Sequence, residues 1–191
     1  MDAEGFIPIA SLLSLPQLQG VTREDIEHIV AADSKQRFHL RTLDEEQSST
    51  GQQLVLMRAN QGHSIPVEQL KLVEIQSAQE CPRAVHGTYR KHLEAITRQG
   101  LSRMSRQYIH LARDVPPAAH PRSQHETAAA ASTVISGMRS NCNVHIWIDV
   151  ADALKDGIRF YRSANDVILT PGNEYGFLLP KYFEKIVEVK K

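Results

Sequence analysis

The sequence contains few cysteines, few aromatic residues and no long apolar run. Cys81 and Cys142 are the only cysteines among 191 residues, which is too few for a disulfide framework, and they lack the paired spacing of a zinc site. No apolar stretch approaches the roughly 18–20 residues that span a bilayer, and no basic region precedes the first apolar residues, as a signal peptide requires. We therefore expect an intracellular protein, cytoplasmic or nuclear, with no metal site and no membrane contact.

Net charge is also absent, but the charges are unevenly distributed. The 22 basic and 22 acidic side chains cancel over the whole chain. Residues 1–33 carry six acidic side chains and one arginine, whereas residues 83–113 carry seven basic side chains and one glutamate. A local cationic surface can bind phosphate groups even on a neutral molecule. The alternative is that residues 83–113 simply form a solvated helix face.

The common nucleotide and metal motifs are missing as well. The chain has no G-x-x-x-x-G-K-[ST] phosphate loop, no G-x-G-x-x-G fingerprint and no H-E-x-x-H pair. These absences give no support to the usual nucleotide-binding folds and argue against a zinc site. What remains is ordinary for a globular protein, with 41% hydrophobic and 23% charged residues in a length that suits one large or two small domains.

The first part of the chain has the pattern of short helices followed by a hairpin. Pro16 ends the first apolar segment, and Thr22 with Asp25 resembles a capping box at the start of a second helix. This order is typical of a winged-helix module, although other small α+β units share it. We predict helices over residues 7–13 and 22–32, and strands over residues 38–40 and 54–57.

The second part has many short strand-like runs and few helices. This pattern predicts an α+β unit with short, irregular sheets. A stretch rich in proline, alanine, serine and histidine, residues 114–133, is interpreted as an inserted loop. We predict a helix over residues 89–98 closed by Gly100, one helical turn over residues 150–155, and a strand or link over residues 67–75. We also predict strands over residues 108–111, 144–150, 158–161, 167–169 and 178–189.

Five polar segments next to predicted strands could carry chemistry. Each combines hydrogen-bond donors with small residues, and glycine allows a ligand to approach the backbone closely. Arginine can bind phosphate oxygens with two parallel hydrogen bonds. For each segment the alternative is an ordinary turn. The segments are residues 35–38, 58–64, 86–88, 105–110 and 163–165.

Taken in order, these segments resemble the RNA 2′-phosphotransferases, a family of NAD-dependent enzymes that remove the 2′-phosphate of a tRNA splice junction. The resemblance runs from about Gly5 to Phe183. It implies a winged-helix-like RNA-binding lobe over residues 1–75 and an ADP-ribosyltransferase-like NAD-binding lobe with short-stranded mixed sheets over residues 76–191. The motifs that carry it are KQRF, RANQGHS, VHGT, RQYIHLA and SANDVILTPGN.

The resemblance implies a reaction with two substrates, 2′-phosphorylated tRNA and NAD, and we expect a monomer. The RNA 2′-phosphate would displace nicotinamide from NAD, and the neighbouring ribose hydroxyl would then take the phosphate. The products would be RNA with a free 2′-hydroxyl, nicotinamide and ADP-ribose 1″,2″-cyclic phosphate. Because the nucleophile is already an anion, it needs positioning and fixed cations more than a base.

The same resemblance implies roles for individual residues. Arg37 and Arg106 would be the phosphate-binding catalytic arginines, and Val167 would stand where protein-modifying relatives have glutamate. The implied NAD-binding residues are His86, Gly87, Thr88, Ser102, His110, Ser163, Asn165 and Val167. Further implied cleft residues are Arg58, Asn60, Gln61, Gly62 and His63.

One departure from the family pattern concerns the start of the chain. The family has an upstream helix with a Leu-Arg-His motif, which does not occur before the DAEGF segment here. We expect either a fragment or alternative product, or a weakened activity. Two alternatives to 2′-phosphotransfer follow: ADP-ribosylation of terminal nucleic-acid phosphates, and binding of RNA or NAD without turnover.

Overall fold

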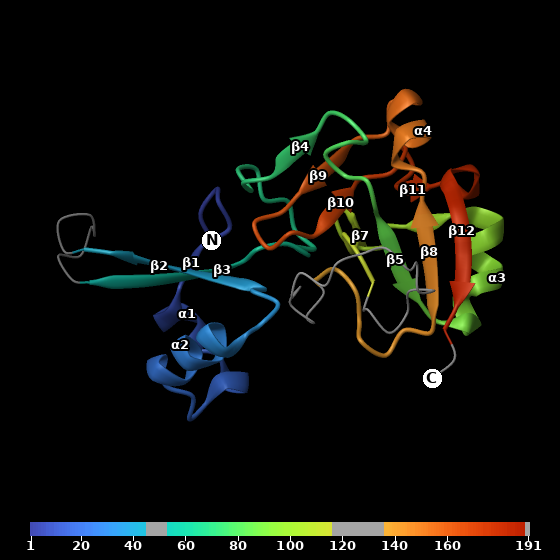
Figure 1. The fold of residues 1–191 in the computed structure, drawn as a ribbon. Coiled ribbons are helices and arrows are strands. Elements are labelled where there is room, and N and C mark those ends of the chain that lie inside the picture. Colours follow the sequence, from blue (N-terminus) through green and yellow to red (C-terminus); the bar gives the residue numbers. More distant parts are fainter. Residues whose placement is uncertain (45–52, 116–135, 190–191) are drawn as a thin grey trace, which may run out of the picture. The chain divides into compact units, whose positions relative to one another are not determined.

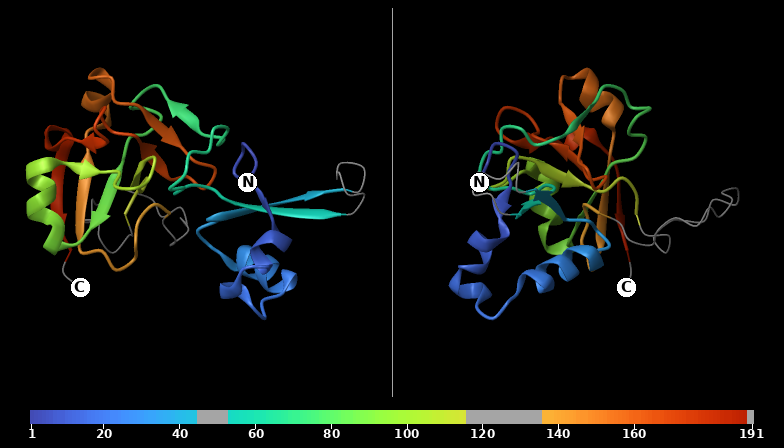
Figure 2. Two further views of the ribbon diagram at one scale, coloured as in Figure 1. Left: turned by 180° about the vertical axis from the view of Figure 1, so that it is seen from behind. Right: turned by 90° about the vertical axis from the view of Figure 1, so that its left-hand side faces the viewer.

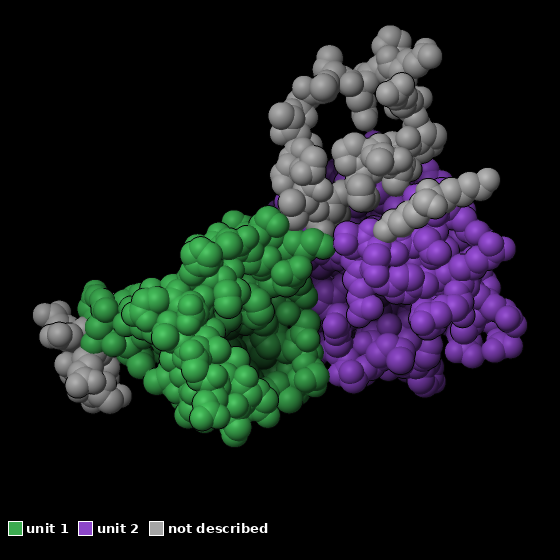
Figure 3. Space-filling model, turned by 90° about the horizontal axis from the view of Figure 1, so that it is seen from below, with its two compact units in different colours: residues 1–71 green, residues 72–191 purple. Residues whose placement is uncertain are grey.

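The computed structural model describes residues 1–44, 53–115 and 136–189, and it divides into two compact units (Figures 1 and 3). The units are Met1–Lys71 and Leu72–Lys191. The sequence places the boundary after residue 75, but Val73–Ile75 form strand β4 and pair with the second unit. Almost all of the expected insertion at residues 114–133 lies outside the described residues.

The first unit packs two α-helices and a 3-10 turn against a three-stranded antiparallel sheet in the order β1-β3-β2. Residues Ile7 and Pro8, which were expected to be helical, instead pair with Met57 and Leu56 as a short strand. A small core holds the unit together around Ile9. The elements are β1 (Ile7–Pro8), α1 (Ile9–Leu13), η1 (Pro16–Leu18), α2 (Arg23–Ala32), β2 (Phe38–Leu43) and β3 (Leu54–Ala59).

The start of α2 confirms the predicted cap. The Thr22 hydroxyl accepts a hydrogen bond from the Asp25 backbone N–H at 3.1 Å, and the Asp25 carboxylate accepts one from the Thr22 backbone N–H at 2.9 Å. The Thr22 backbone N–H, and the Thr22 hydroxyl that also donates to the Asp25 carboxylate at 2.8 Å, lower the pKa of Asp25. The reciprocal bonds satisfy two N–H groups that the helix itself leaves unpaired.

The second unit contains two main sheets, β4-β9-β10-β7 and β12-β8-β5, and a small pair, β11-β6 (Figure 1). Helix α3 lies against the sheet that contains β12 (Figure 2). Its Leu93 and Ile96 pack on the core. The elements are β4 (Val73–Ile75), β5 (Val85–Thr88), α3 (Arg90–Gln99), β6 (Leu101–Ser102), β7 (Ile109–Leu111), β8 (Val144–Ile148), α4 (Val150–Lys155), β9 (Phe160–Arg162), β10 (Ile168–Thr170), β11 (Phe177–Leu178), η4 (Pro180–Tyr182) and β12 (Phe183–Glu188).

Three predicted strands of the second unit are shorter than expected. The run at residues 67–75 forms a strand only over Val73–Ile75. The run at residues 144–150 stops at Ile148, because the Asp149 carboxylate accepts a hydrogen bond from the Asp152 backbone N–H and so caps α4. The run at residues 178–189 is interrupted by Pro180, which begins a 3-10 turn. The observed fold is nevertheless the predicted mixture of short sheets and few helices.

The sheet β4-β9-β10-β7 has two different faces. Ile109, Phe160 and Ile168 are buried in the core of the second unit. Tyr161, Leu169 and His110 stand opposite one another across β9, β10 and β7, so their side chains share the other face.

Helices within the described ranges are too short or too polar to cross a membrane.

Candidate functional site

In the first unit, Arg37 is positioned by a turn that follows α2. The Asp33 carboxylate accepts hydrogen bonds from the backbone N–H groups of Lys35 at 3.2 Å and Arg37 at 2.7 Å. The same carboxylate pairs with the Arg37 guanidinium at 2.9 Å. The Arg37 side chain remains 54% exposed, so the guanidinium is accessible as well as oriented.

Asn60 fixes this turn from the neighbouring strand. It follows the last paired residues of β2 and β3, Phe38 and Ala59. Its backbone N–H donates to the Arg37 carbonyl at 2.8 Å, and its side-chain amide donates to the Gln36 carbonyl at 2.6 Å. Gln36 has φ +47°, a left-handed conformation that is costly without such support. Asn60 is therefore a buried support for Arg37, not a free side chain.

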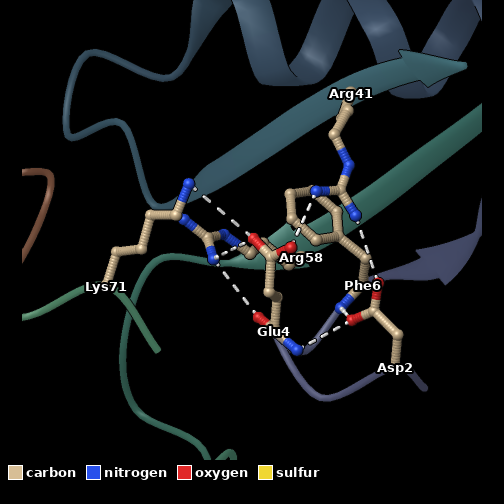
Figure 4. A network of polar contacts seen from close by, with 6 residues as sticks. All are labelled: Asp2, Glu4, Phe6, Arg41, Arg58 and Lys71. Carbon is tan, nitrogen blue, oxygen red and sulfur yellow. Dashed lines mark hydrogen bonds and ion pairs between the residues drawn. The ribbon is translucent and has the colours of Figure 1, made fainter. Parts of the chain in front are cut away.

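Arg58 belongs to a network around the N-terminal segment (Figure 4). Its guanidinium donates to the Glu4 carbonyl at 3.2 Å and lies over the Phe6 ring at 4.8 Å. Arg41 covers the same ring at 3.9 Å and pairs with the carboxylates of Asp2 at 3.1 Å and Glu4 at 3.0 Å. Within this unit Arg58 is 8% exposed and holds the N-terminal segment to β3.

The remaining residues expected to line a cleft in the first unit lie just beyond β3. Gly62 has φ +90° in a bend, which explains a glycine there. Both ring nitrogens of His63 are buried and have no hydrogen-bond partner among the described residues. Burial and then the charge of Arg58 lower the pKa of His63. Gln61 is partly buried in the same bend.

In the second unit, a hydrogen bond joins the two expected histidines. The Nδ1 atom of His86 on β5 lies 3.0 Å from the carbonyl oxygen of His110 on β7. Because a carbonyl can only accept, Nδ1 carries the proton and Nε2 of the neutral ring has a free lone pair. Burial lowers the pKa of His86, which favours this neutral form.

His110 is a partly buried neutral histidine whose pKa is affected by a nearby arginine. Burial and then the charge of Arg106 lower its pKa to about 4. Its Nε2 atom is buried and has no hydrogen-bond partner in the described parts of the chain. An unsatisfied buried nitrogen costs free energy unless a ligand supplies the missing hydrogen bond. His110 thus offers a ligand an uncharged polar contact next to a permanent cation.

Arg106 is exposed on a short loop between β6 and β7, and its guanidinium has no carboxylate partner within the described residues. The Arg103 guanidinium donates to the Arg106 carbonyl at 2.9 Å, and the Arg103 backbone N–H donates to the Gly176 carbonyl at 3.0 Å. The Ser102 hydroxyl accepts from the Met104 backbone N–H at 3.0 Å. Ser102, expected at an NAD site, therefore also shapes the loop that carries Arg106.

Ser163, Asn165 and Val167 form the turn between β9 and β10. The buried Ser163 hydroxyl donates to Asn165 Oδ1 at 2.9 Å and accepts from the Val167 backbone N–H at 3.1 Å. Val167 is fully buried. These contacts give the three residues a clear structural role in the turn.

Gly87 and Thr88 also have structural roles. A Cβ atom at Gly87 would lie 2.7 Å from the Cys142 sulfur and would collide with Met138, so any larger residue would disrupt this packing. The Thr88 carbonyl accepts a hydrogen bond from the Asn143 backbone N–H at 3.1 Å. The glycine is explained by packing inside the unit.

Sequence reasoning missed Asp33, which orients Arg37. The available signal was an aspartate directly after an amphipathic helix, a position where its carboxylate can accept from nearby backbone N–H groups. It also could not show that Arg106 and His110 interact, because that depends on the loop conformation. Within the described ranges, no three His, Cys, Asp or Glu residues are grouped to hold a metal ion.

The chain is similar to known proteins over its whole length. Residues 1–172 match the model of the RNA 2′-phosphotransferase, Tpt1/KptA family. The chain is 45% identical over 191 residues to the human protein named tRNA 2′-phosphotransferase 1, covering 100% of this chain and 68% of that protein. It is 35% identical to tRNA 2′-phosphotransferase of Saccharomyces cerevisiae, covering 89% and 69%, and 33% identical to a probable RNA 2′-phosphotransferase of Streptomyces coelicolor, covering 88% and 77%. The chain belongs to the RNA 2′-phosphotransferase family.

Proposed function

We propose that the chain transfers the 2′-phosphate of a tRNA splice junction to NAD, leaving RNA with a free 2′-hydroxyl, nicotinamide and ADP-ribose 1″,2″-cyclic phosphate. The named activities of the relatives support the substrate. The observation that carries the proposal is the Arg106 guanidinium, which has no carboxylate partner among the described residues and whose charge acts on His110. A phosphate needs such a fixed cation, and the second reactant needs polar groups without added charge.

The folds of the two units support separate binding roles, with RNA bound by the first unit and NAD by the second. Two helices followed by the antiparallel strand pair β2-β3 in the first unit fit a winged-helix-like lobe that binds RNA. Two short-stranded sheets joined by the hydrogen bond from His86 to the His110 carbonyl fit an ADP-ribosyltransferase-like lobe in the second unit. We assign NAD to the second unit on this basis.

The residues near His110 fit NAD as a reactant. The buried Nε2 atom of His110 lacks a partner, and His86 keeps a lone pair on Nε2, so both rings can contact sugar hydroxyl or amide groups. When bound, NAD supplies a ribose carbon whose bond to nicotinamide breaks as a phosphate oxygen attacks, and an adjacent hydroxyl that then takes the phosphorus. A neutral His110 avoids repelling the cationic nicotinamide ring.

The arginines then bind and orient the phosphate. Arg106 can donate two parallel hydrogen bonds to its oxygens and stabilise charge that accumulates when the phosphorus is attacked. Arg37 is proposed as a second phosphate ligand on the strength of the family motif, with Asp33 and Asn60 setting its direction. Neither arginine has to move a proton, because the attacking oxygen is already negatively charged.

Product analysis tests the proposal. The protein is incubated with NAD and a short RNA that carries one internal 2′-phosphate, with and without a Leu-Arg-His helix joined upstream of Met1. We expect nicotinamide, cyclic phosphate and free 2′-hydroxyl in equal amounts. A stable ADP-ribosylated RNA would instead identify terminal-phosphate ADP-ribosylation or an arrested first step, and no nicotinamide in either sample would refute the proposal.

A further inference from the structure

The second unit contains a pocket of about 370 Å³ that none of the residues discussed above explains. It lies over one end of the sheet β4-β9-β10-β7. Two tyrosines, one arginine and one glutamate are among its lining side chains. The lining residues are Tyr108, Gly157, Arg159, Tyr161, Pro171, Gly172, Asn173 and Glu174.

Aromatic rings form one wall of this pocket. The rings of Tyr108 and Tyr161 meet edge to face, with centroids 5.8 Å apart and an interplanar angle of 69°. Alternation along the strands places both on the face of the sheet that carries His110. Both are only partly buried, so ring surface remains available to a flat ligand.

The polar groups of the pocket include both a donor and an acceptor. Arg159 and Glu174 are exposed, and neither side chain has an ion-pair partner within the described ranges. Asn173 Oδ1 already accepts from the backbone N–H groups of Tyr175 and Phe177, both at 3.0 Å, which leaves its amide N–H groups for a ligand. Aromatic surface flanked by a guanidinium, an amide and a carboxylate suits the edge of a nucleobase.

The pocket is also connected to the loop that carries Arg106. Asn173 and Glu174 line one side of the pocket, and the Gly176 carbonyl of the same turn accepts a hydrogen bond from the Arg103 backbone N–H at 3.0 Å. Arg103 in turn binds the Arg106 carbonyl at 2.9 Å. Hydrogen bonds therefore link the pocket to the loop that carries the arginine proposed to hold the RNA phosphate.

An RNA base fits this location better than the adenine of NAD. Ser163 and Asn165, expected at the NAD site, lie in the turn at the opposite end of β9 and β10 from Arg159 and Pro171. We propose that this pocket binds a base of the RNA substrate, at or next to the 2′-phosphorylated nucleotide. The proposal rests on the proposed function, because it assumes that Arg106 binds RNA phosphate.

A binding cycle without NAD tests the pocket separately from catalysis. Fluorescence anisotropy measures the Kd of the full chain for a labelled 2′-phosphorylated RNA. It also measures the Kd for three abasic versions of that RNA, which lack the base of the phosphorylated nucleotide, of its 5′ neighbour or of its 3′ neighbour. Stacking of a base on an aromatic side chain predicts about tenfold weaker binding for one abasic RNA. In Arg159→Ala and Tyr161→Leu, that same abasic change is expected to have little further effect.

Two controls separate base recognition from charge and folding. Arg98→Ala removes an equal charge from exposed helix α3 and should leave the abasic effect intact, whereas Tyr161→Phe keeps the ring and should bind like the wild type. The proposal is overturned if all three abasic RNAs bind as tightly as the parent RNA. It is also overturned if the abasic effect persists in both pocket variants, or if those variants raise only the KM for NAD. Failure of the product assay alone would refute the proposed reaction and leave this binding result standing.

Discussion

The arginines of the two units differ in what they contact. All four arginines of the first unit, Arg23, Arg37, Arg41 and Arg58, have a carboxylate within 4.0 Å. In the second unit Arg106 has none within the described residues, although Arg113 pairs with Asp166. The acidic bias of residues 1–33 is thus used largely to neutralise arginines of the same unit. An arginine count therefore says less about phosphate binding than the distribution of carboxylates does.

The largest expected effect comes from removing the Arg106 guanidinium. Arg106→Ala should lower the rate of nicotinamide release from NAD with 2′-phosphorylated RNA by about 10²–10³-fold, the usual effect of losing one transition-state donor. Arg98→Ala, an exposed arginine on α3, should keep wild-type activity. Equal rates for Arg106→Ala and the wild type would show that an arginine without a carboxylate partner is no more important for activity than the paired arginines of the first unit.

The second effect concerns pH and the neutral histidine next to Arg106. The folded-state pKa of His110 is lowered from 6.5 to about 4, so the unfolded state binds the proton more readily. The resulting stability is fully present above about pH 6.5 and is lost as the pH falls toward 4, by at most about 3 kcal/mol. Urea unfolding at several pH values should show a shallower pH dependence in His110→Gln. As a control, His28→Gln changes an exposed histidine of the first unit and should leave the pH dependence of unfolding of the second unit as in the wild type.

A third effect tests whether the first unit needs its paired charges. Glu4→Gln removes the carboxylate next to Arg41 and the buried Arg58. Because Glu4 is 27% exposed, we expect a loss of about 1–2 kcal/mol in the free energy of unfolding, below the cost of breaking a fully buried pair. Urea denaturation measures it, with the exposed Glu68→Gln as control. If both variants are equally stable, the network contributes no net stability.

The smallest effect concerns the support of Arg37. Asn60→Ala removes the side-chain hydrogen bond to the Gln36 carbonyl and should cost about 1 kcal/mol of stability. If Arg37 binds the RNA phosphate, kcat should fall further than this stability loss explains, while the KM for NAD stays constant. Leu43→Ala, a partly buried position at the far end of the same strand pair, is the control for destabilisation alone. A similar loss of kcat in both variants would leave Asn60 no positioning role.

Local sequence patterns predicted the elements that depend on neighbouring residues. Thr22 and Asp25 predicted the start of α2, and Gly100 predicted the end of α3, where it has φ +98°. The pairing of Ile7 with Met57 was missed because it depends on a contact fifty residues away. Periodicity gave no information on such a partner.

The candidate site was predicted as a set of residues but not as a geometry. Motifs named Arg106 and His110, yet the depressed pKa of His110 depends on burial by distant strands. They also named Gly87, Ser163 and Asn165, whose observed contacts are within the fold. Two quoted motifs, RQYIHLA and SANDVILTPGN, contain Tyr108 and residues 171–173. The pocket that these residues form with Arg159 and Tyr161 could not be predicted, because its lining residues come from separate segments.

The hydrogen bond from the Arg103 backbone N–H to the Gly176 carbonyl makes the Arg106 loop and the turn at residues 173–176 a single mechanical unit. Its amide proton can exchange with solvent only when the two segments separate. The exchange rate of this one proton therefore reports how often the arginine loop detaches. A ligand that binds either segment should slow that exchange, which offers a direct measure of occupancy that needs no turnover.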